Sequence, residues 1–257
     1  MNNDIRAALM GDRDETKLTH LSLFAGIGGL DLAAEMAGFE TVGQCEWADY
    51  PTKILEKHWP DVPRWRDIRT LTKESFYDRT GRTTVDVVSG GFPCQPFSVA
   101  GKRRGKEDDR YLWPEMLRII SELRPAWVVG ENVAGIVNMA LDTVYADLEG
   151  IGYAVQAFVV PACAVDAPHR RDRCAILAYA DCRRCIRRKN EKQSAKTREH
   201  AQRIPGRRGW WPTEPDVCRV VDGVPHWVDR LRCLGNAVVP QQFYPVFKAI
   251  ADIERRS

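Results

Sequence analysis

Short apolar runs alternate with amphipathic stretches along most of the chain. Apolar runs bounded by glycine and other turn residues predict strands at residues 18–26, 40–47, 85–91, 126–133, 153–160 and 173–179. Stretches whose apolar residues recur every three or four positions predict helices at residues 30–38, 49–59, 111–123, 139–150 and 237–253. This alternation predicts an α/β fold with a doubly wound, mostly parallel sheet covered by helices on both faces. Ligands bind such sheets beyond the carboxyl ends of the strands.

The alternation stops after residue 179. Residues 180–218 have little apolar periodicity and are rich in Arg, Lys, Gln, Gly and Pro, and an apolar pattern resumes in residues 219–257. We therefore expect an extension at residues 1–17, an α/β domain at residues 18–179, a basic insertion at residues 180–218, and a return to the same domain at the C-terminal end.

The charge is distributed unevenly. Residues 183–208 hold 11 of the 38 Lys and Arg residues but only 2 of the 35 Asp and Glu residues, so the rest of the chain is net acidic although the whole carries +3. Such a segment is typical of a surface that binds a polyanion, and equally of a solvated loop.

Composition excludes several protein classes. With 257 residues, 44% of them hydrophobic, the chain can bury a sizeable core. No apolar run approaches the roughly 18 residues of a membrane span, and the charged first residues lack the apolar block of a secretion signal. We expect a cytoplasmic protein with no membrane partner, whose eight cysteines are thiols rather than disulfides.

A glycine-rich turn and three acidic or aromatic positions suggest a nucleoside site. The turn Phe24–Gly29 follows a strand and opens a helix, which lets a ligand approach the backbone closely. A dinucleotide fingerprint would need glycine where Asp31 stands. Glu46 ends the second strand, where a carboxylate can accept hydrogen bonds from ribose hydroxyls. The neighbouring Trp47 could stack on an adenine, and Asp67 could accept a bond from its exocyclic amine. Alternatively, these are a packing turn and surface side chains.

Three further positions carry candidate reactive groups. Cys94 lies between two prolines directly after a strand, in a rigid loop that suits a thiolate nucleophile. Glu131 ends the fourth strand, where a desolvated carboxyl with a raised pKa could act as an acid, or simply cap a helix. Arg171 and Arg173 occupy alternate positions, which would place them on one face of a strand to grip a phosphate or base carbonyl, unless they are only the charged start of that strand.

A series of motifs along the chain resembles, in content and order, the motifs of the DNA (cytosine-5)-methyltransferases. In sequence order they are FAGIGG, EW, DI, GFPCQPFS, ENV, the arginine pair and LGNAVVPQ. The resemblance extends from Leu21 to the terminal helix and leaves out the first 17 residues and the basic insertion. It implies a Rossmann-like fold with a small target-recognition region, S-adenosyl-L-methionine as methyl donor and double-stranded DNA as substrate. The short recognition segment is similar to that of compact phage or orphan bacterial enzymes. The resemblance implies a role in restriction-modification or in protecting phage or host DNA. We expect a monomer without a metal.

The resemblance also implies roles for individual residues. The expected catalytic residues are the nucleophile Cys94, Glu131 at cytosine N3, and the Arg-x-Arg pair Arg171 and Arg173. The expected donor-binding residues are Phe24, Gly26, Ile27, Gly28, Gly29, Glu46, Trp47, Asp67, Ile68, Pro93, Asn236 and Ala237. The expected DNA-binding residues are Gln95, Ser98, Arg183, Arg184, Arg187, Arg188, Arg207 and Arg208.

The implied chemistry explains why these groups occur together. Thiolate addition to cytosine C6 makes C5 nucleophilic, a proton or hydrogen bond at N3 stabilises the developing charge, and the base must first leave the duplex. The chain departs from the family pattern at His169, where Gln is usual, and in a shortened motif that leaves Arg219 and the sequence Gly-Val-Pro at 223–225.

Three alternatives remain at this point. The first is the same chemistry on RNA, although the Cys-Phe-Thr tripeptide of that branch is absent. The second is a nucleic-acid-binding relative without catalysis, against which the intact motifs argue. The third is a zinc site built on Cys182 and Cys185, with ligands from Cys174, His200 or Cys218, whose spacing matches no common zinc module.

Overall fold

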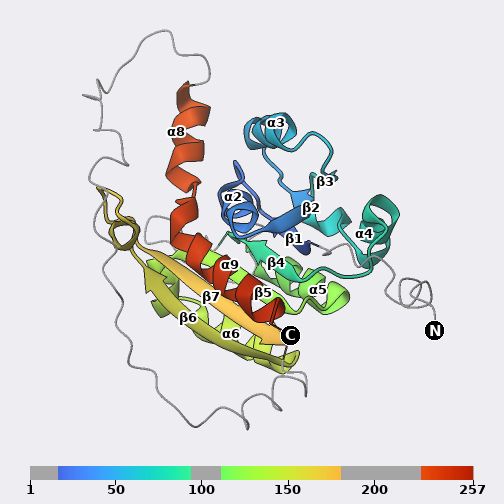
Figure 1. The fold of residues 1–257 in the computed structure, drawn as a ribbon. Coiled ribbons are helices and arrows are strands. Elements are labelled where there is room, and N and C mark those ends of the chain that lie inside the picture. The colour runs from blue at the N-terminus through green and yellow to red at the C-terminus, as the bar shows by residue number, and fades with distance from the viewer. Residues whose placement is uncertain (1–16, 94–110, 181–226, 257) are drawn as a thin grey trace, which may run out of the picture.

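The computed structural model describes residues 17–93, 111–180 and 227–256. In these ranges seven strands form one sheet in the order β3-β2-β1-β4-β5-β7-β6 (Figure 1). The strands are β1 (Leu18–Leu23), β2 (Phe39–Cys45), β3 (Arg64–Trp65), β4 (Val87–Gly90), β5 (Trp127–Val133), β6 (Tyr153–Val160) and β7 (Arg173–Ala180). Strands β1 to β5 are parallel, and β7 is antiparallel to both β5 and β6. The predicted doubly wound, mostly parallel sheet is confirmed.

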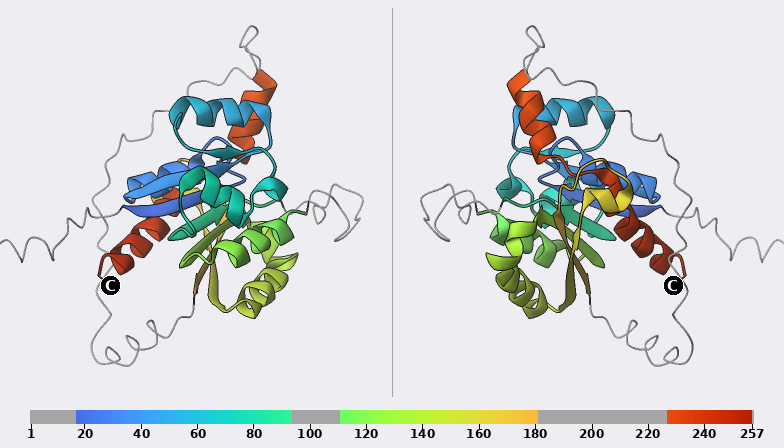
Figure 2. Two further views of the ribbon diagram at one scale, coloured as in Figure 1. Left: turned by 90° about the vertical axis from the view of Figure 1, so that its right-hand side faces the viewer. Right: turned by 90° about the vertical axis from the view of Figure 1, so that its left-hand side faces the viewer.

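Helices cover both faces of this sheet (Figure 2). They are α2 (Gly29–Met36), α3 (Asp49–His58), α4 (Lys73–Thr80), α5 (Trp113–Leu123), α6 (Leu141–Gly150), α8 (Trp227–Asn236) and α9 (Pro240–Glu254). Helices α2 and α9 pack on one face, and α4, α5 and α6 on the other. Three short 3-10 turns are η1 (Ile68–Thr70), η3 (Ala134–Asn138) and η4 (Ala162–Val165).

The two cores follow from the two-residue period of the strands. On β5, for example, Val128 packs into the core beneath α5 and α6, whereas Val129 packs into the core beneath α2 and α9. Both residues are buried, as expected for strands covered on both sides. The near-continuous apolar runs of the sequence therefore reflect burial on both faces.

Sequence reasoning missed β3, α4 and α8 as elements. Strand β3 has only two residues, too few for a periodic pattern. Helix α4 did carry local signals: Thr72 forms a capping box with Ser75, and Gly81 ends the helix with φ 68°. Strand β7 was predicted, but its antiparallel direction was not, because only the pairing shows that the chain returns between β5 and β6.

Candidate active site

A cavity of about 1290 Å³ lies at the carboxyl ends of β1, β2, β4 and β5. Its walls come from the glycine turn, from the residues after β2, β3 and β4, from the end of β5, and from α8 with the two residues that follow it. Of the residues singled out in the sequence, it brings together Phe24, Gly26, Ile27, Gly29, Glu46, Trp47, Asp67, Ile68, Pro93, Glu131, Arg173, Asn236 and Ala237. Donor-site and base-site candidates thus share one cavity.

The glycine turn takes a shape that requires glycine. Gly26 and Gly28 have φ of 55° and 87°, in the left-handed region. A Cβ on Gly28 would lie 2.5 Å from the ring of Trp59, so this residue makes room for packing. Gly28 is not among the residues that line the cavity, so its expected place in the donor site stays a prediction.

Glu46 joins the end of β2 to the glycine turn. Its Oε2 accepts the N–H of Gly26 at 2.8 Å, and its Oε1 accepts the N–H of Ala48 at 2.8 Å. Each oxygen keeps a lone pair for a further hydrogen bond. The adjacent Trp47 is 71% exposed beside the cavity, which leaves its ring face open to a planar group.

Asp67 has a structural task in addition to its expected place on the cavity wall. It caps η1, with Oδ1 accepting the N–H of Arg69 at 2.9 Å, and its other oxygen lies 3.7 Å from the Arg69 guanidinium. Its neighbour Ile68 is buried against the same cavity wall. The carboxylate therefore shapes the turn that carries Ile68, and its expected contact with the adenine stays a prediction.

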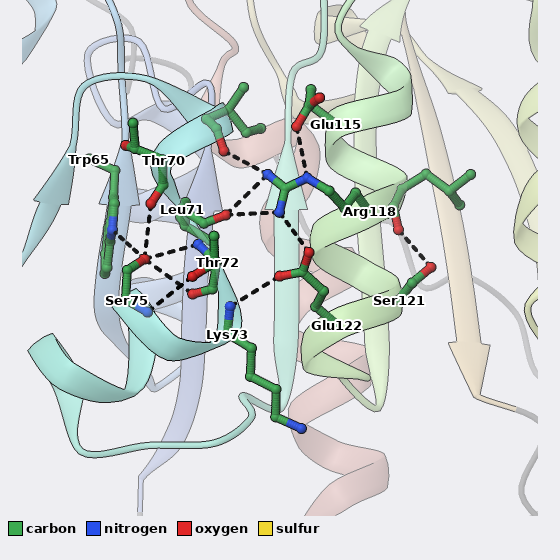
Figure 3. A network of polar contacts seen from close by, with 12 residues as sticks. Trp65, Thr70, Leu71, Thr72, Lys73, Ser75, Glu115, Arg118, Ser121 and Glu122 are labelled. Carbon is green, nitrogen blue, oxygen red and sulfur yellow. Dashed lines mark hydrogen bonds and ion pairs between the residues drawn. The ribbon is translucent and has the colours of Figure 1, made fainter.

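This turn is held in place by Arg118 on α5, as Figure 3 shows. The Arg118 guanidinium donates to the carbonyl of Ile68 at 2.9 Å and to that of Leu71 at 3.1 Å. Ion pairs with Glu115 at 2.9 Å and Glu122 at 2.7 Å fix the guanidinium from its own helix. Nothing in the local sequence pattern marked Arg118, because i,i+3 and i,i+4 pairs are common on exposed helix faces.

The base side of the cavity is built around Glu131. Its Oε1 lies 2.8 Å from Nε of Arg173, and both side chains are largely buried, with 13% and 11% exposed. Burial raises the pKa of Glu131, while the positive charges of Arg173 and Arg171 oppose that rise. A carboxyl in this setting can hold a proton and donate it or a hydrogen bond to a ligand.

Two neighbours fix the position of this carboxyl. A Cβ on Gly91 would lie 2.7 Å from Oε2 of Glu131, so glycine leaves the space that the carboxyl occupies. Asn132 donates from Nδ2 to the carbonyl of Phe92 at 2.9 Å, which ties the end of β5 to the residues after β4. Pro93 lies on the cavity wall, and Cys94, the next residue in the chain, lies outside the described residues.

Comparison with known proteins identifies the family. The sequence model described as C-5 cytosine-specific DNA methylase matches residues 18–213. The chain belongs to this family. It is 36% identical over 176 residues to the Type II methyltransferase M.Eco47II of Escherichia coli, covering 64% of this chain and 41% of that protein. It is 32% identical over 173 residues to the Type II methyltransferase M.HhaI of Haemophilus parahaemolyticus, covering 65% of this chain and 51% of that protein.

A solved structure supports the same fold. The Dnmt2 methyltransferase of S. pombe superposes with a TM-score of 0.55 at 23% identity, over 65% of this chain and 52% of that one. The sheet is thus that of the Rossmann-like methyltransferases. The chain spans about 40–50% of the length of the two curated relatives named above.

Within this methylase fold, the Arg-x-Arg pair is divided between two tasks. Arg173 begins β7 and faces Glu131, whereas Arg171 precedes the strand with φ 34° and does not line the cavity. The expectation that the two share a strand face is therefore wrong, because the two-residue period holds only within a strand. The Arg171 guanidinium instead donates to carbonyls of Leu234 and Gly235, in the last turn of α8, and of Ala237, directly after it.

Buried polar residues beneath the glycine turn also escaped sequence reasoning. Asp31 in the first turn of α2 is completely buried and accepts hydrogen bonds from Ser22 and Gln44, each at 2.8 Å. Burial raises its pKa to about 6. In the sequence, Asp31 stood out only as a residue that breaks the glycine pattern of a dinucleotide-binding turn. Its burial results from the packing of β1, β2 and α2 against one another, which the local sequence does not show.

The remaining predicted residues lie outside the described ranges. These are Gln95, Ser98, Arg183, Arg184, Arg187, Arg188, Arg207 and Arg208, together with the zinc candidates Cys182, Cys185, His200 and Cys218. Cys174 is described and is fully buried in β7. Residues 17–93, 111–180 and 227–256 contain no cluster of three metal-ligating side chains. None of the helices in those ranges has the length and apolar character needed to cross a bilayer.

Proposed function

We propose that this protein transfers a methyl group from S-adenosyl-L-methionine to C5 of cytosine in double-stranded DNA. The observation that carries this proposal is the single cavity shared by Glu46 and Trp47 on one side and the Glu131–Arg173 pair on the other. Its volume of about 1290 Å³ exceeds the roughly 300–1,000 Å³ of a pocket for one small ligand. It has room for a donor and a base together.

The donor-side residues fit the methyl donor of the family. The Glu46 carboxylate, already fixed by two backbone N–H groups, would accept hydrogen bonds from the ribose hydroxyls. The exposed ring of Trp47 and the buried Ile68 would contact the adenine. Asn236 and Ala237 would complete the wall. When bound, S-adenosyl-L-methionine supplies an electrophilic methyl group on a sulfonium.

The base-side residues would prepare the cytosine. Cys94 would add as a thiolate to C6, and the protonated Glu131 would donate to N3 as electron density moves onto the ring. After C5 has gained the methyl group, loss of the C5 proton and elimination of the Cys94 thiolate from C6 would restore the aromatic ring. Burial of Glu131 supports this role, because it favours the protonated carboxyl. Arg173 would keep that carboxyl oriented and would balance its charge when the proton is given up.

The basic insertion would bind the DNA backbone while the target base is out of the helix. The proposal further includes a role in restriction-modification or phage DNA protection, a monomeric state and a cytoplasmic location. The restriction-modification role is supported by the bacterial Type II methyltransferases among the relatives. The monomeric state and the location are carried over from the sequence as predictions.

The test is methylation by the purified full chain. The protein is incubated with S-adenosyl-L-methionine and unmethylated genomic or phage DNA, and 5-methyl-2′-deoxycytidine is measured by mass spectrometry after digestion. The modified nucleoside should appear with wild-type protein and be absent with Cys94→Ser, because a hydroxyl is a far weaker nucleophile. Total RNA is the matched substrate control. Methylation of RNA alone, or wild-type-like activity in Cys94→Ser, would overturn the proposal.

A further inference from the structure

The side chain and the main chain of Arg171 both form hydrogen bonds with residues 234–242 near the C-terminal end of the described chain. Nη2 of Arg171 is surrounded by the carbonyl oxygens of Leu234 at 3.2 Å, Gly235 at 2.7 Å and Ala237. In return, Nε2 of Gln242 on α9 donates to the carbonyl of Arg171 at 3.0 Å. Gln242 is 1% exposed and also donates to the carbonyl of Val160 at 2.7 Å.

These carbonyls need a donor from outside their own helix. Helix α8 ends at Asn236 and α9 begins at Pro240, so the last carbonyls of α8 have few backbone N–H groups within reach. The C-terminal end of a helix also carries partial negative charge, which favours a cation there. Nη2 of a guanidinium carries two N–H groups in a fixed plane, so it can serve these three carbonyls when one N–H is shared between two of them.

The segment held by Arg171 forms one wall of the donor side of the cavity. Asn236 and Ala237 line the cavity directly. Val238 packs against the glycine turn so closely that a Cβ on Gly29 would lie 2.7 Å from its Cγ1 and 2.9 Å from its carbonyl oxygen. A shift of this segment would therefore move the wall next to the glycine turn.

The main chain of Arg171 reaches the base side as well. Arg171 lies two residues before Arg173, whose guanidinium pairs with Glu131 at 2.8 Å. Its φ of 34° is uncommon for a residue with a side chain, and it persists because contacts on both sides of the residue determine it. One residue thus connects the wall of the donor side with the charged pair of the base side.

We propose that Arg171 is a positioning residue that holds residues 234–238 against the glycine turn and keeps Arg173 opposite Glu131. This inference rests on the proposed function, because it assigns a task within that site. Arg171 touches neither ligand; it acts through Asn236, Ala237 and Arg173.

The test compares Arg171→Ala and Arg171→Lys with the control Arg170→Ala. The Arg170 side chain is 82% exposed and pairs with Asp172, so its removal leaves the contacts of residues 234–238 intact. Binding of S-adenosyl-L-homocysteine is measured by calorimetry, and KM for the methyl donor and kcat by methyl transfer. Arg171→Ala should weaken binding and raise KM at least tenfold, with a smaller loss in kcat. Arg171→Lys should recover part of the loss, and Arg170→Ala should behave as wild type.

Gln242→Met provides a second route if Arg171→Ala does not fold. It leaves the guanidinium in place and removes the donor to the carbonyl of Arg171. A raised KM for the methyl donor in Gln242→Met supports the inference. Donor binding of wild-type strength in folded Arg171→Ala or in folded Gln242→Met overturns the inference and leaves the proposed function standing. Failure of the wild-type protein to bind S-adenosyl-L-homocysteine overturns the proposed function instead.

Discussion

Glu46 accepts the backbone N–H of Gly26 at 2.8 Å, so a carboxylate predicted to bind a ribose also fixes the turn beside it. Two parallel strands deliver these groups: β1 leads into the turn and β2 ends just before Glu46. The relationship makes Glu46 both a candidate ligand contact and a support for the turn. The first prediction follows from this double use.

Glu46→Gln should weaken S-adenosyl-L-methionine binding roughly ten- to hundred-fold. The substitution removes a charge and places an amide N–H against a backbone N–H, and a hydrogen bond to a charged group contributes about 1.5–3 kcal/mol. Calorimetric titration measures the change. Glu40→Gln, on the exposed side of β2, is the control and should bind as wild type. Unchanged affinity in Glu46→Gln would remove this carboxylate from the donor site.

Gly91→Ala should lower kcat by at least tenfold and leave donor affinity almost unchanged. The new Cβ would lie 2.7 Å from Oε2 of Glu131, so the carboxyl must move away from its position beside Arg173. Single-turnover methylation and donor titration separate the two effects. Gly150→Ala is the matched control, because a Cβ there meets nothing within 4 Å. Full activity in Gly91→Ala would show that the carboxyl tolerates displacement.

Asp31→Asn should stabilise the protein at pH 8 and have little effect near pH 4. Because burial raises the folded pKa of Asp31 from 3.8 to about 6, its contribution to stability is greatest below pH 3.8 and falls as the pH rises to about 6. The full cost at higher pH is about 3 kcal/mol, from roughly two pKa units. An asparagine amide can accept from Gln44 and donate to Ser22, so it replaces both contacts without a charge.

Urea denaturation of wild type and Asp31→Asn at pH 4, 5, 6 and 8 tests this prediction. The difference in the free energy of unfolding should grow as pH increases between about 4 and 6 and then level off. A constant difference across this range would mean that Asp31 does not titrate there.

Arg118→Met should raise KM for the methyl donor several-fold with little change in kcat. The substitution keeps the packing of the aliphatic stem and removes the donors that hold the carbonyls of Ile68 and Leu71 (Figure 3). Ile68 lies on the part of the cavity wall proposed to contact the methyl donor. Loosening this turn therefore weakens binding of the methyl donor and leaves the cytosine side of the cavity unchanged. Ser121→Ala on the same helix is the control, since its hydroxyl bonds only within α5. Equal KM values for the two variants would contradict the assigned task of Arg118.

Much of the fold could be predicted because its signals are local. The apolar runs marked β1, β2, β5, β6 and β7 to within a few residues, and the periodic stretches marked α2, α3, α5 and α9. Candidate residues at the carboxyl ends of parallel strands could be expected to meet, and Glu46 and Glu131 do line one cavity. Local pattern did not reveal what the long side chains bind.

The sequence by itself determined most of the alternating strands and helices of the α/β domain, the glycine turn and the placement of carboxylates at strand ends. Each of these depends on residues within one turn or one strand, where period and turn chemistry act. Only the tertiary structure decided that Arg171 binds carbonyls more than sixty positions away, that Arg118 supports η1, and that β7 lies between β5 and β6. A flexible guanidinium donates to whichever unpaired carbonyls the fold brings near, and that depends on packing between segments distant in the chain.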